Sequence, residues 1–349
     1  MELKTTLESQ TVQNRIREVG INPNHWYPVA WANQLQRGTV QKVTIWYQDI
    51  AIYRDEEGNV HALSDACPHK GVALHKGDVK GTHLACRYHG WEFNGEGECV
   101  HIPYFNEDQK LPRACAHSYP IQEKYDLIWL FPGNRELATR QPILDIPEFD
   151  DSQWLCVPVT AYFNAHFSMC NENTMDVFHG YLHQDLQGWF NPELISLKET
   201  DDRVCAQYNV SYTGRIAKFL GLTDRADEIT TLPITIEYRY PHYATTLEGV
   251  SSLYLMRLPV SKTESHSFAY FFFNIGLPQW LLNPIRPLLV RVLQRFVLYK
   301  FLRQDIEMVE SEQETYLKNP QRQCVEVNPA IFAIQRLILR QYDQAINDS

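Results

Sequence analysis

The sequence predicts an α+β protein with two main domains: a small all-β domain, then a larger one in which helices cover an antiparallel sheet. Three observations lead to this prediction. The chain has 349 residues, which is more than one typical domain. Short β-branched and aromatic runs separated by turn signals fill its first part. Later strand-like runs are followed by long helical patterns, and this order is typical of α+β proteins.

The first domain is predicted over residues 25–135, after a polar lead-in at residues 1–24. Runs such as 43–48 alternate with Gly- and Asn-containing turns, as expected for short strands. Residues 136–152 combine prolines with acidic side chains and are predicted to be a linker. The second domain therefore covers residues 153–349.

The second domain begins with a predicted strand at residues 155–164 and one helix over about 168–183. Two long helical patterns close the chain, at 284–319 and 329–346. Between them lie the remaining strand-like runs, at 203–212, 234–240, 243–247, 252–258 and 267–275.

Composition excludes several classes of protein. With 44% hydrophobic and 21% charged residues, the chain is not intrinsically disordered. Its 42 acidic and 32 basic residues give a net charge of −10, which disfavours a nucleic-acid partner. We see neither a signal peptide nor an apolar run of about 18 residues, so we expect a cytoplasmic protein. Eight cysteines in such a chain do not indicate a disulfide framework.

Two of the cysteines form a metal-ligand pattern with two histidines. Cys67 and His69 are separated by one residue, and Cys86 and His89 by two. Two thiolates and two imidazoles suit either zinc or a [2Fe–2S] cluster with two histidines on one iron. Zinc sites usually pair like ligands within one loop, whereas here each loop supplies one of each kind. The spacing therefore favours the cluster.

A second group of polar residues lies in the predicted helix at 168–183. Asn173, Asp176, His179 and His183 are three, three and four positions apart, so they are expected to share one helical face. The two histidines are one turn apart and can chelate one metal ion, although two imidazoles alone are more readily explained as exposed or core histidines. Two imidazoles and one carboxylate form the facial triad of non-haem Fe(II) oxygenases.

The carboxylate of this triad is predicted to be Asp305, which lies early in a C-terminal helix with apolar residues on its face. Asp185 and Glu307 are the competing carboxylates. Read alone, Asp305 is better explained as a solvated acid near the start of a helix.

Together the two motifs resemble the Rieske non-haem iron oxygenases, the α subunits of aromatic-ring-hydroxylating oxygenases, over about residues 25–320. The resemblance implies that Asp176 links the iron site to a Rieske histidine of a neighbouring subunit and that Asn173 lies close by. The family usually places four or five residues between the two histidines, whereas this chain has three. The resemblance also implies the ligands: Cys67, His69, Cys86 and His89 for the [2Fe–2S] cluster, and His179, His183 and Asp305 for mononuclear Fe(II).

The resemblance implies an enzyme that uses O₂ to hydroxylate, demethylate or desaturate a ring-containing small molecule. No Gly-rich dinucleotide fingerprint is present, so NAD(P)H is expected to act only through a separate reductase or ferredoxin. A homotrimer is expected, and an additional β subunit is left open. The alternative is a Rieske-type electron carrier, which does not need the second motif.

The segment at residues 284–303 has five basic side chains, no acid and many large apolar residues. It is either a helix packed on the sheet with paired arginines or a peripheral membrane contact. The membrane interpretation implies a lipophilic substrate, and the chlorophyllide/pheophorbide-oxidising and sterol-oxidising branches of the family are similar in plan. The Cys-x-x-Cys usual near the C-terminus of the pheophorbide branch is missing. His166, Phe178, Tyr181, Phe271 and Phe273 are either pocket residues or ordinary core.

Overall fold

The chain folds into two compact units in a computed structural model, which describes residues 12, 14–106, 108–183, 189–213, 218, 225, 227–276, 278–322 and 324–347. Asn22–Ile143 form one unit, and Leu144–Ser349 form the other together with the segment that ends at Ile21. The predicted α+β class is confirmed. Within the described residues, no helix is long and apolar enough to span a membrane.

The smaller unit consists of short antiparallel strands in three sheets. The sheet orders are β1-β10-β9, β2-β3-β4 and β5-β6-β7-β8. Its core contains Tyr53, Leu74, Leu84 and Phe93, all fully buried. The strands are β1 (Tyr27–Trp31), β2 (Thr39–Ile45), β3 (Gln48–Arg54), β4 (Val60–Ser64), β5 (Asp78–Lys80), β6 (His83–Ala85), β7 (Glu92–Phe93), β8 (Cys99–His101), β9 (Ile121–Lys124) and β10 (Leu127–Leu130), with the short helix α2 (Arg135–Ala138) after them.

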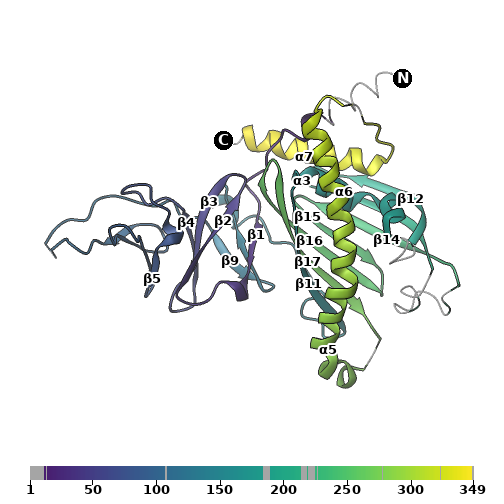
Figure 1. Ribbon diagram of the computed structural model, residues 1–349, viewed down its shortest axis with the longest axis horizontal. Helices are drawn as coiled ribbons and strands as arrows, with labels where there is room; N and C mark the ends of the chain where they lie inside the picture. The colour runs from purple at the N-terminus through teal and green to yellow at the C-terminus, as the bar shows by residue number, and fades with distance from the viewer. Residues whose placement is uncertain are drawn as a thin grey trace. The chain divides into compact units, whose positions relative to one another are not determined.

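The larger unit is built on one seven-stranded antiparallel sheet in the order β11-β17-β16-β15-β14-β13-β12 (Figure 1). Its outermost strand β12 is absent from the sequence prediction, because Asn191 and Pro192 interrupt the strand pattern there. The strands are β11 (Trp154–Phe163), β12 (Trp189–Glu199), β13 (Arg203–Tyr212), β14 (Thr230–Arg239), β15 (His242–Leu247), β16 (Ser251–Ser261) and β17 (Glu264–Asn274).

Helices cover one face of this sheet, and buried tyrosines connect the two layers. The helices are α3 (Phe167–Met175), α5 (Gln279–Leu293), α6 (Tyr299–Lys318) and α7 (Pro329–Asn347). Tyr238 and Tyr243 point from the sheet to Asn171 of α3, and Tyr208 bonds Asn328 just before α7. A π-helical turn, Gln294–Leu298, joins α5 to α6, so the pair forms one long run across the sheet (Figure 1).

The single helix predicted over residues 168–183 is wrong, because the structure breaks it at Asp176. Helix α3 ends at Met175, Asp176 has extended backbone, and Val177–His183 form a 3₁₀ segment. One oxygen of the Asp176 side chain accepts the amide of Phe178 at 3.0 Å, which makes Asp176 the N-cap of that segment. The four polar residues of the motif therefore do not lie on one continuous helix.

Candidate metal centres and the adjoining cavity

Two similar loops in the smaller unit present the cysteine–histidine pairs. The amide of each cysteine donates to the carbonyl five positions later, at 2.9 Å for Cys67 and 2.8 Å for Cys86. The glycine four positions after each cysteine, Gly71 or Gly90, donates its amide back to the cysteine carbonyl at 2.8 and 2.9 Å. Both glycines have φ near +70°, which side-chain-bearing residues rarely adopt, so the loop geometry requires glycine there.

The loops bury the sulfur atoms and leave the imidazoles nearer the surface. Cys67 and Cys86 are each 3% exposed, while His69 and His89 are half-buried with ring centres 4.6 Å apart. The indole of Trp91 stacks on His69 at 4.4 Å. This donor set fits a [2Fe–2S] cluster, because two thiolates can hold a buried iron and two imidazoles a more exposed one.

The second centre brings together His179, His183 and Asp305 in the larger unit. One ligand atom from each lies within 4.8 Å of the others. Asp305 comes from α6, is buried, and places Oδ1 3.1 Å from His183 Nε2 and 3.7 Å from His179 Nε2. The Asn173 amide lies 3.4 Å from the same oxygen. Of the competing carboxylates, Glu307 is exposed, and Asp185 lies outside the described residues.

The outer nitrogens of both histidines have partners that orient the rings. His183 Nδ1 lies 3.0 Å from the side-chain oxygen of Gln304, and His179 Nδ1 bonds the carbonyl of Asp176. Burial lowers the pKa of His179 despite the nearby Asp305 carboxylate, so its imidazole is neutral. An oxygen acceptor at each Nδ1 would leave each Nε2 to bind a metal ion beside Asp305. Two neutral nitrogens and one carboxylate suit divalent iron with open coordination positions.

Sequence reasoning missed Gln304 and Asn328. The Asn328 amide donates to Asp176 Oδ1 at 3.2 Å, and its oxygen accepts the hydroxyl of Tyr208 at 3.1 Å. Gln304 immediately precedes the predicted ligand Asp305, which is a weak signal for it. Asn328 lies 152 positions from Asp176, and no local pattern indicates their contact.

The glycine between the two histidines is required by a tryptophan. Trp189 packs over both imidazoles, with ring centres 5.7 Å from His179 and 5.5 Å from His183, and donates its indole N–H to the Val177 carbonyl. A Cβ added at Gly180 would lie 1.3 Å from the indole nitrogen. Position 180 therefore cannot carry a side chain while Trp189 keeps its place.

Gly180→Ala should therefore disturb the centre formed by His179, His183 and Asp305 and leave the cysteine–histidine centre intact. The methyl group must displace the Trp189 indole, and a site whose supporting contacts shift typically loses about 10–100-fold in metal affinity. Iron and sulfide analysis should show less mononuclear iron at unchanged sulfide. Adding Trp189→Leu, which makes room for the methyl group, should restore part of the iron. Full iron occupancy in Gly180→Ala alone would contradict this explanation.

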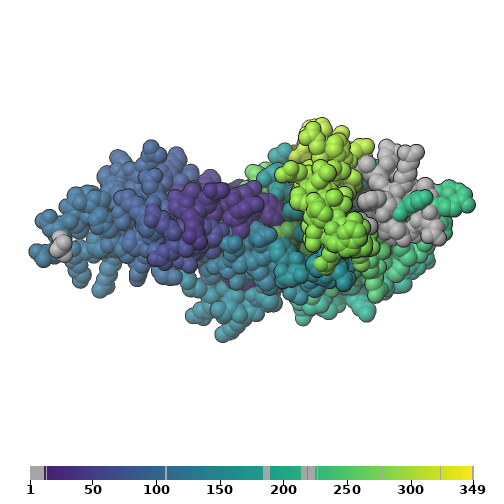
Figure 2. Space-filling view, turned by 90° about the horizontal axis from the view of Figure 1, so that it is seen from below, coloured from purple at the N-terminus to yellow at the C-terminus, as the bar shows by residue number. Residues whose placement is uncertain are grey.

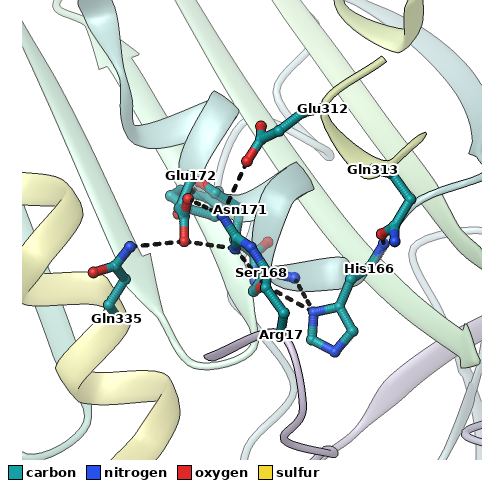
Figure 3. Close-up of polar contacts among 9 residues, drawn as sticks. Arg17, His166, Ser168, Asn171, Glu172, Glu312, Gln313 and Gln335 are labelled. Atoms are coloured by element: carbon teal, nitrogen blue, oxygen red, sulfur yellow. Dashed lines mark hydrogen bonds and ion pairs between the residues drawn. The ribbon is translucent and has the colours of Figure 1, made fainter. Parts of the chain in front are cut away.

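An ion-pair network centred on the buried side chain of Arg17 holds α3 against its neighbours (Figure 3). Arg17 donates to both oxygens of Glu172 on α3, at 2.7 and 2.6 Å, and to Ser168 at 2.6 Å. The same guanidinium reaches Glu312 on α6 at 3.0 Å, and Gln335 on α7 bonds Glu172 at 3.0 Å. The network thus joins the helix that leads to the histidines with the helix that carries Asp305.

His166 belongs to this network and not to the cavity. Its Nδ1 lies 2.7 Å from the Ser168 hydroxyl (Figure 3). Its Nε2 lies 3.1 Å from the Val19 carbonyl inside the core. Burial, reinforced by the positive charge of Arg17, lowers the pKa of His166 to about 3. This environment agrees with one of the two sequence interpretations, in which His166 is an ordinary core residue.

The lowered pKa of His166 predicts acid sensitivity of the larger unit. The unfolded chain binds a proton near pH 6.5, whereas the folded chain does not until about pH 3. The free energy of unfolding should therefore fall by about 1.4 kcal/mol per pH unit as the pH drops between these values. Denaturant unfolding from pH 7 to 5 measures this slope. His166→Gln should flatten it, and an unchanged slope would exclude His166 as its source.

A cavity of about 520 Å³ adjoins the second centre. His179 and Asp305 are part of its lining, and apolar side chains of the sheet and of the α5–α6 run form most of its wall. Phe271 and Phe273 line it, as one sequence interpretation expected. Both sequence interpretations are wrong for Phe178 and Tyr181, which are exposed and are not part of the cavity lining. A cavity of this size and character suits a single drug-sized apolar molecule.

Only one cation, Arg257, lines the cavity among the described residues, and its donors already have partners. Its three nitrogens bond the side chains of Asn171, Ser267 and Thr174 and the carbonyl of Cys170. Among the residues that the structure describes, the wall therefore offers no uncommitted positive group to an acidic ligand.

Two family models match the parts of the chain that contain the two centres. Residues 25–120 match the model of the Rieske [2Fe–2S] domain, and residues 163–347 match that of the vanillate O-demethylase oxygenase C-terminal domain. The chain is 33% identical to a 4β-methylsterol monooxygenase of Methylococcus capsulatus, over 95% of this chain and 91% of the relative. It is 34% identical to the oxygenase component of dicamba O-demethylase of Stenotrophomonas maltophilia, over 46% and 47% of the two chains.

A solved structure also shares this fold. The crystal structure of dicamba monooxygenase bound to 3,6-dichlorosalicylic acid matches with a TM-score of 0.75. The match covers 94% of this chain and 99% of that one, at 23% identity. At this identity the likeness is one of fold.

Proposed function

Because the chain belongs to the Rieske non-haem iron oxygenases, we propose that it is a terminal oxygenase for a neutral, lipophilic, ring-containing molecule bound beside the iron site. The protein is an oxidoreductase whose cofactors are a [2Fe–2S] cluster and mononuclear iron. It works with electrons from a separate ferredoxin or reductase, so NAD(P)H acts on it indirectly. The cavity that reaches from apolar walls to His179 and Asp305 is the observation that carries the substrate proposal.

We assign the cofactors to the two donor sets described above. The four side chains of the loop pairs would hold the cluster: Cys67, His69, Cys86 and His89. His179, His183 and Asp305 would hold the iron, with Gln304 fixing one imidazole and the Asp176 carbonyl the other. Bound here, the two groups supply one-electron transfer and the activation of O₂. The chain itself orients the ligands and keeps the cavity apolar.

The absence of an uncommitted cation in the described wall favours a neutral substrate. An acidic substrate buried there would lose its hydration without gaining an uncommitted cationic side chain as a partner, which is costly. A methyl-substituted polycyclic molecule, related to the methylsterol in the name of the Methylococcus relative, fits a large apolar cavity. Asn173 and Thr174, which line it near the metal centre, could bond a hydroxyl group of such a molecule.

Turnover with labelled oxygen tests this proposal. The protein is supplied with NADH, a ferredoxin–reductase pair and ¹⁸O₂, and is given either a 4-methylsterol or dicamba, an aromatic acid. We expect ¹⁸O in a product of the sterol and little reaction of the acid. Dicamba demethylation at the faster rate would contradict the proposed substrate class.

The proposed assembly is a homotrimer, because Asp176 matches the family residue that connects one subunit's iron to its neighbour's cluster. The proposed location is the cytoplasm. Sedimentation analysis should find three copies, and a fully active monomer would rule out the trimer.

Peripheral contact with a membrane through residues 284–303 is also part of the proposal. The alternative, a helix packed on the sheet with paired arginines, does not account for the large apolar side chains that this helix exposes to solvent.

A further inference from the structure

The α5–α6 run exposes a long apolar ridge to solvent. Apolar side chains recur on one helical face at Leu281, Ile285 and Leu288 and continue at Val292 and beyond, with intervals of three or four residues. Leu288 and Phe296 are each 65% exposed, and Trp280 at the start of α5 is 74% exposed. Figure 2 shows the yellow-green atoms of this run at the molecular surface. An apolar surface of this extent usually marks a binding face.

Basic side chains accompany the ridge, and acidic ones are missing. No Asp or Glu occurs between residues 278 and 304 of a chain whose net charge is −10. Arg291, Arg295, Lys300 and Arg303 are exposed, and none forms an ion pair within the described part of the chain. Cations beside an exposed apolar helical face are complementary to anionic lipid headgroups above acyl chains.

The cavity reaches the surface on this same side. Val292 is 41% exposed on the ridge and also lines the cavity. Leu289 and Leu293, on the adjacent part of the helix, are half-buried and face the cavity too. Asn274, at the end of β17, is both exposed and part of the cavity lining. These residues place a mouth of the cavity beside the apolar ridge.

We propose that the ridge lies on an anionic lipid surface and that the cavity opens into that surface, so that a membrane-dissolved substrate enters without crossing water. This inference rests on the proposed function, since it specifies where a neutral polycyclic substrate comes from. A second copy of this chain is the competing occupant of the ridge. The unpaired cations favour lipid, because two copies meeting through this face would bring like charges together.

Flotation with vesicles tests the first half. The protein should bind vesicles of phosphatidylcholine with phosphatidylglycerol and bind less to phosphatidylcholine alone. The triple variant Arg291→Gln, Arg295→Gln, Lys300→Gln should weaken binding roughly a hundredfold, and Leu288→Ser with Phe296→Ser should also weaken it. The matched control replaces exposed apolar residues elsewhere, Leu317→Ser with Val327→Ser, and should bind normally. Absent wild-type binding, or equal binding by all variants, would overturn the proposal.

Photo-crosslinking tests the position of the mouth. p-Benzoylphenylalanine is placed at position 274, 288 or 317, and adducts on vesicles are identified by mass spectrometry. We expect lipid adducts at 274 and 288 and none at 317. Lipid adducts at 288 alone would show that the mouth does not face lipid, and chain-to-chain adducts at 288 would show a subunit contact; either overturns the inference. Neither readout needs turnover, so lipid adducts without sterol oxidation would instead overturn the proposed function.

Discussion

Asp305→Ala should abolish substrate oxidation while leaving the [2Fe–2S] cluster intact. The Asp305 carboxylate lies within 3.7 Å of both imidazole Nε2 atoms, and without it only two neutral nitrogens face the site. We expect the variant to lose about one iron per chain, because two imidazoles hold Fe(II) weakly. Metal analysis and the spectrum of the reduced cluster measure the two centres separately.

Glu307→Ala is the matched control for this variant. Glu307 lies on the same helix two positions later, but its side chain is exposed. The Glu307→Ala variant should retain its mononuclear iron and its oxidation activity. Normal iron content in Asp305→Ala, or loss of iron in Glu307→Ala, would show that the ligand has been assigned to the wrong carboxylate.

Asp176→Asn should slow turnover roughly a hundredfold, at the upper end of the effect of residues that support a metal site, with both centres still filled. One Asp176 oxygen accepts the Phe178 amide and the Asn328 amide, and its main-chain carbonyl bonds His179. Asparagine preserves the shape and the main-chain contact but removes the negative charge that the proposed link to a neighbouring cluster requires. Single-turnover rates of electron transfer from reduced cluster to substrate measure this step.

The control for Asp176→Asn is Asp201→Asn, an exposed change in the same unit, which should leave the rate unaltered. A decrease of iron in Asp176→Asn would show that the residue supports the metal site itself. Normal turnover with both centres filled would refute the proposed link between subunits.

The sequence predicted the local features well because short-range geometry determines them. The cysteine–histidine loops are encoded within six residues each, including the glycines that their backbone requires. The histidine pair and Asp305 could be proposed from spacing and from the resemblance, and the structure brings all three together. The break at Asp176 was missed although an aspartate is a common N-cap, since helical periodicity was extended through it.

Features that depend on contacts between distant segments could not be predicted. Asn328 and Trp189 reach the second centre only because the chain folds back on itself, and neither belongs to a recognisable local pattern. Arg17 is a further example. It belongs to the polar segment at residues 1–24, and nothing in that segment indicates that its side chain is buried in the core. The exposure of the apolar ridge also depends on which side of α5 the sheet covers. Composition alone therefore could not decide between a helix packed on the sheet and a membrane contact.

The central claim is that this chain carries a [2Fe–2S] cluster and a separate mononuclear iron. Iron and acid-labile sulfide per chain, measured on anaerobically purified protein, test it most directly. We predict about three iron and two sulfide per chain, with both centres filled. About two iron and two sulfide that persist after reconstitution with Fe(II) would contradict the assignment of His179, His183 and Asp305, and with it the proposed oxygenase chemistry of the cavity.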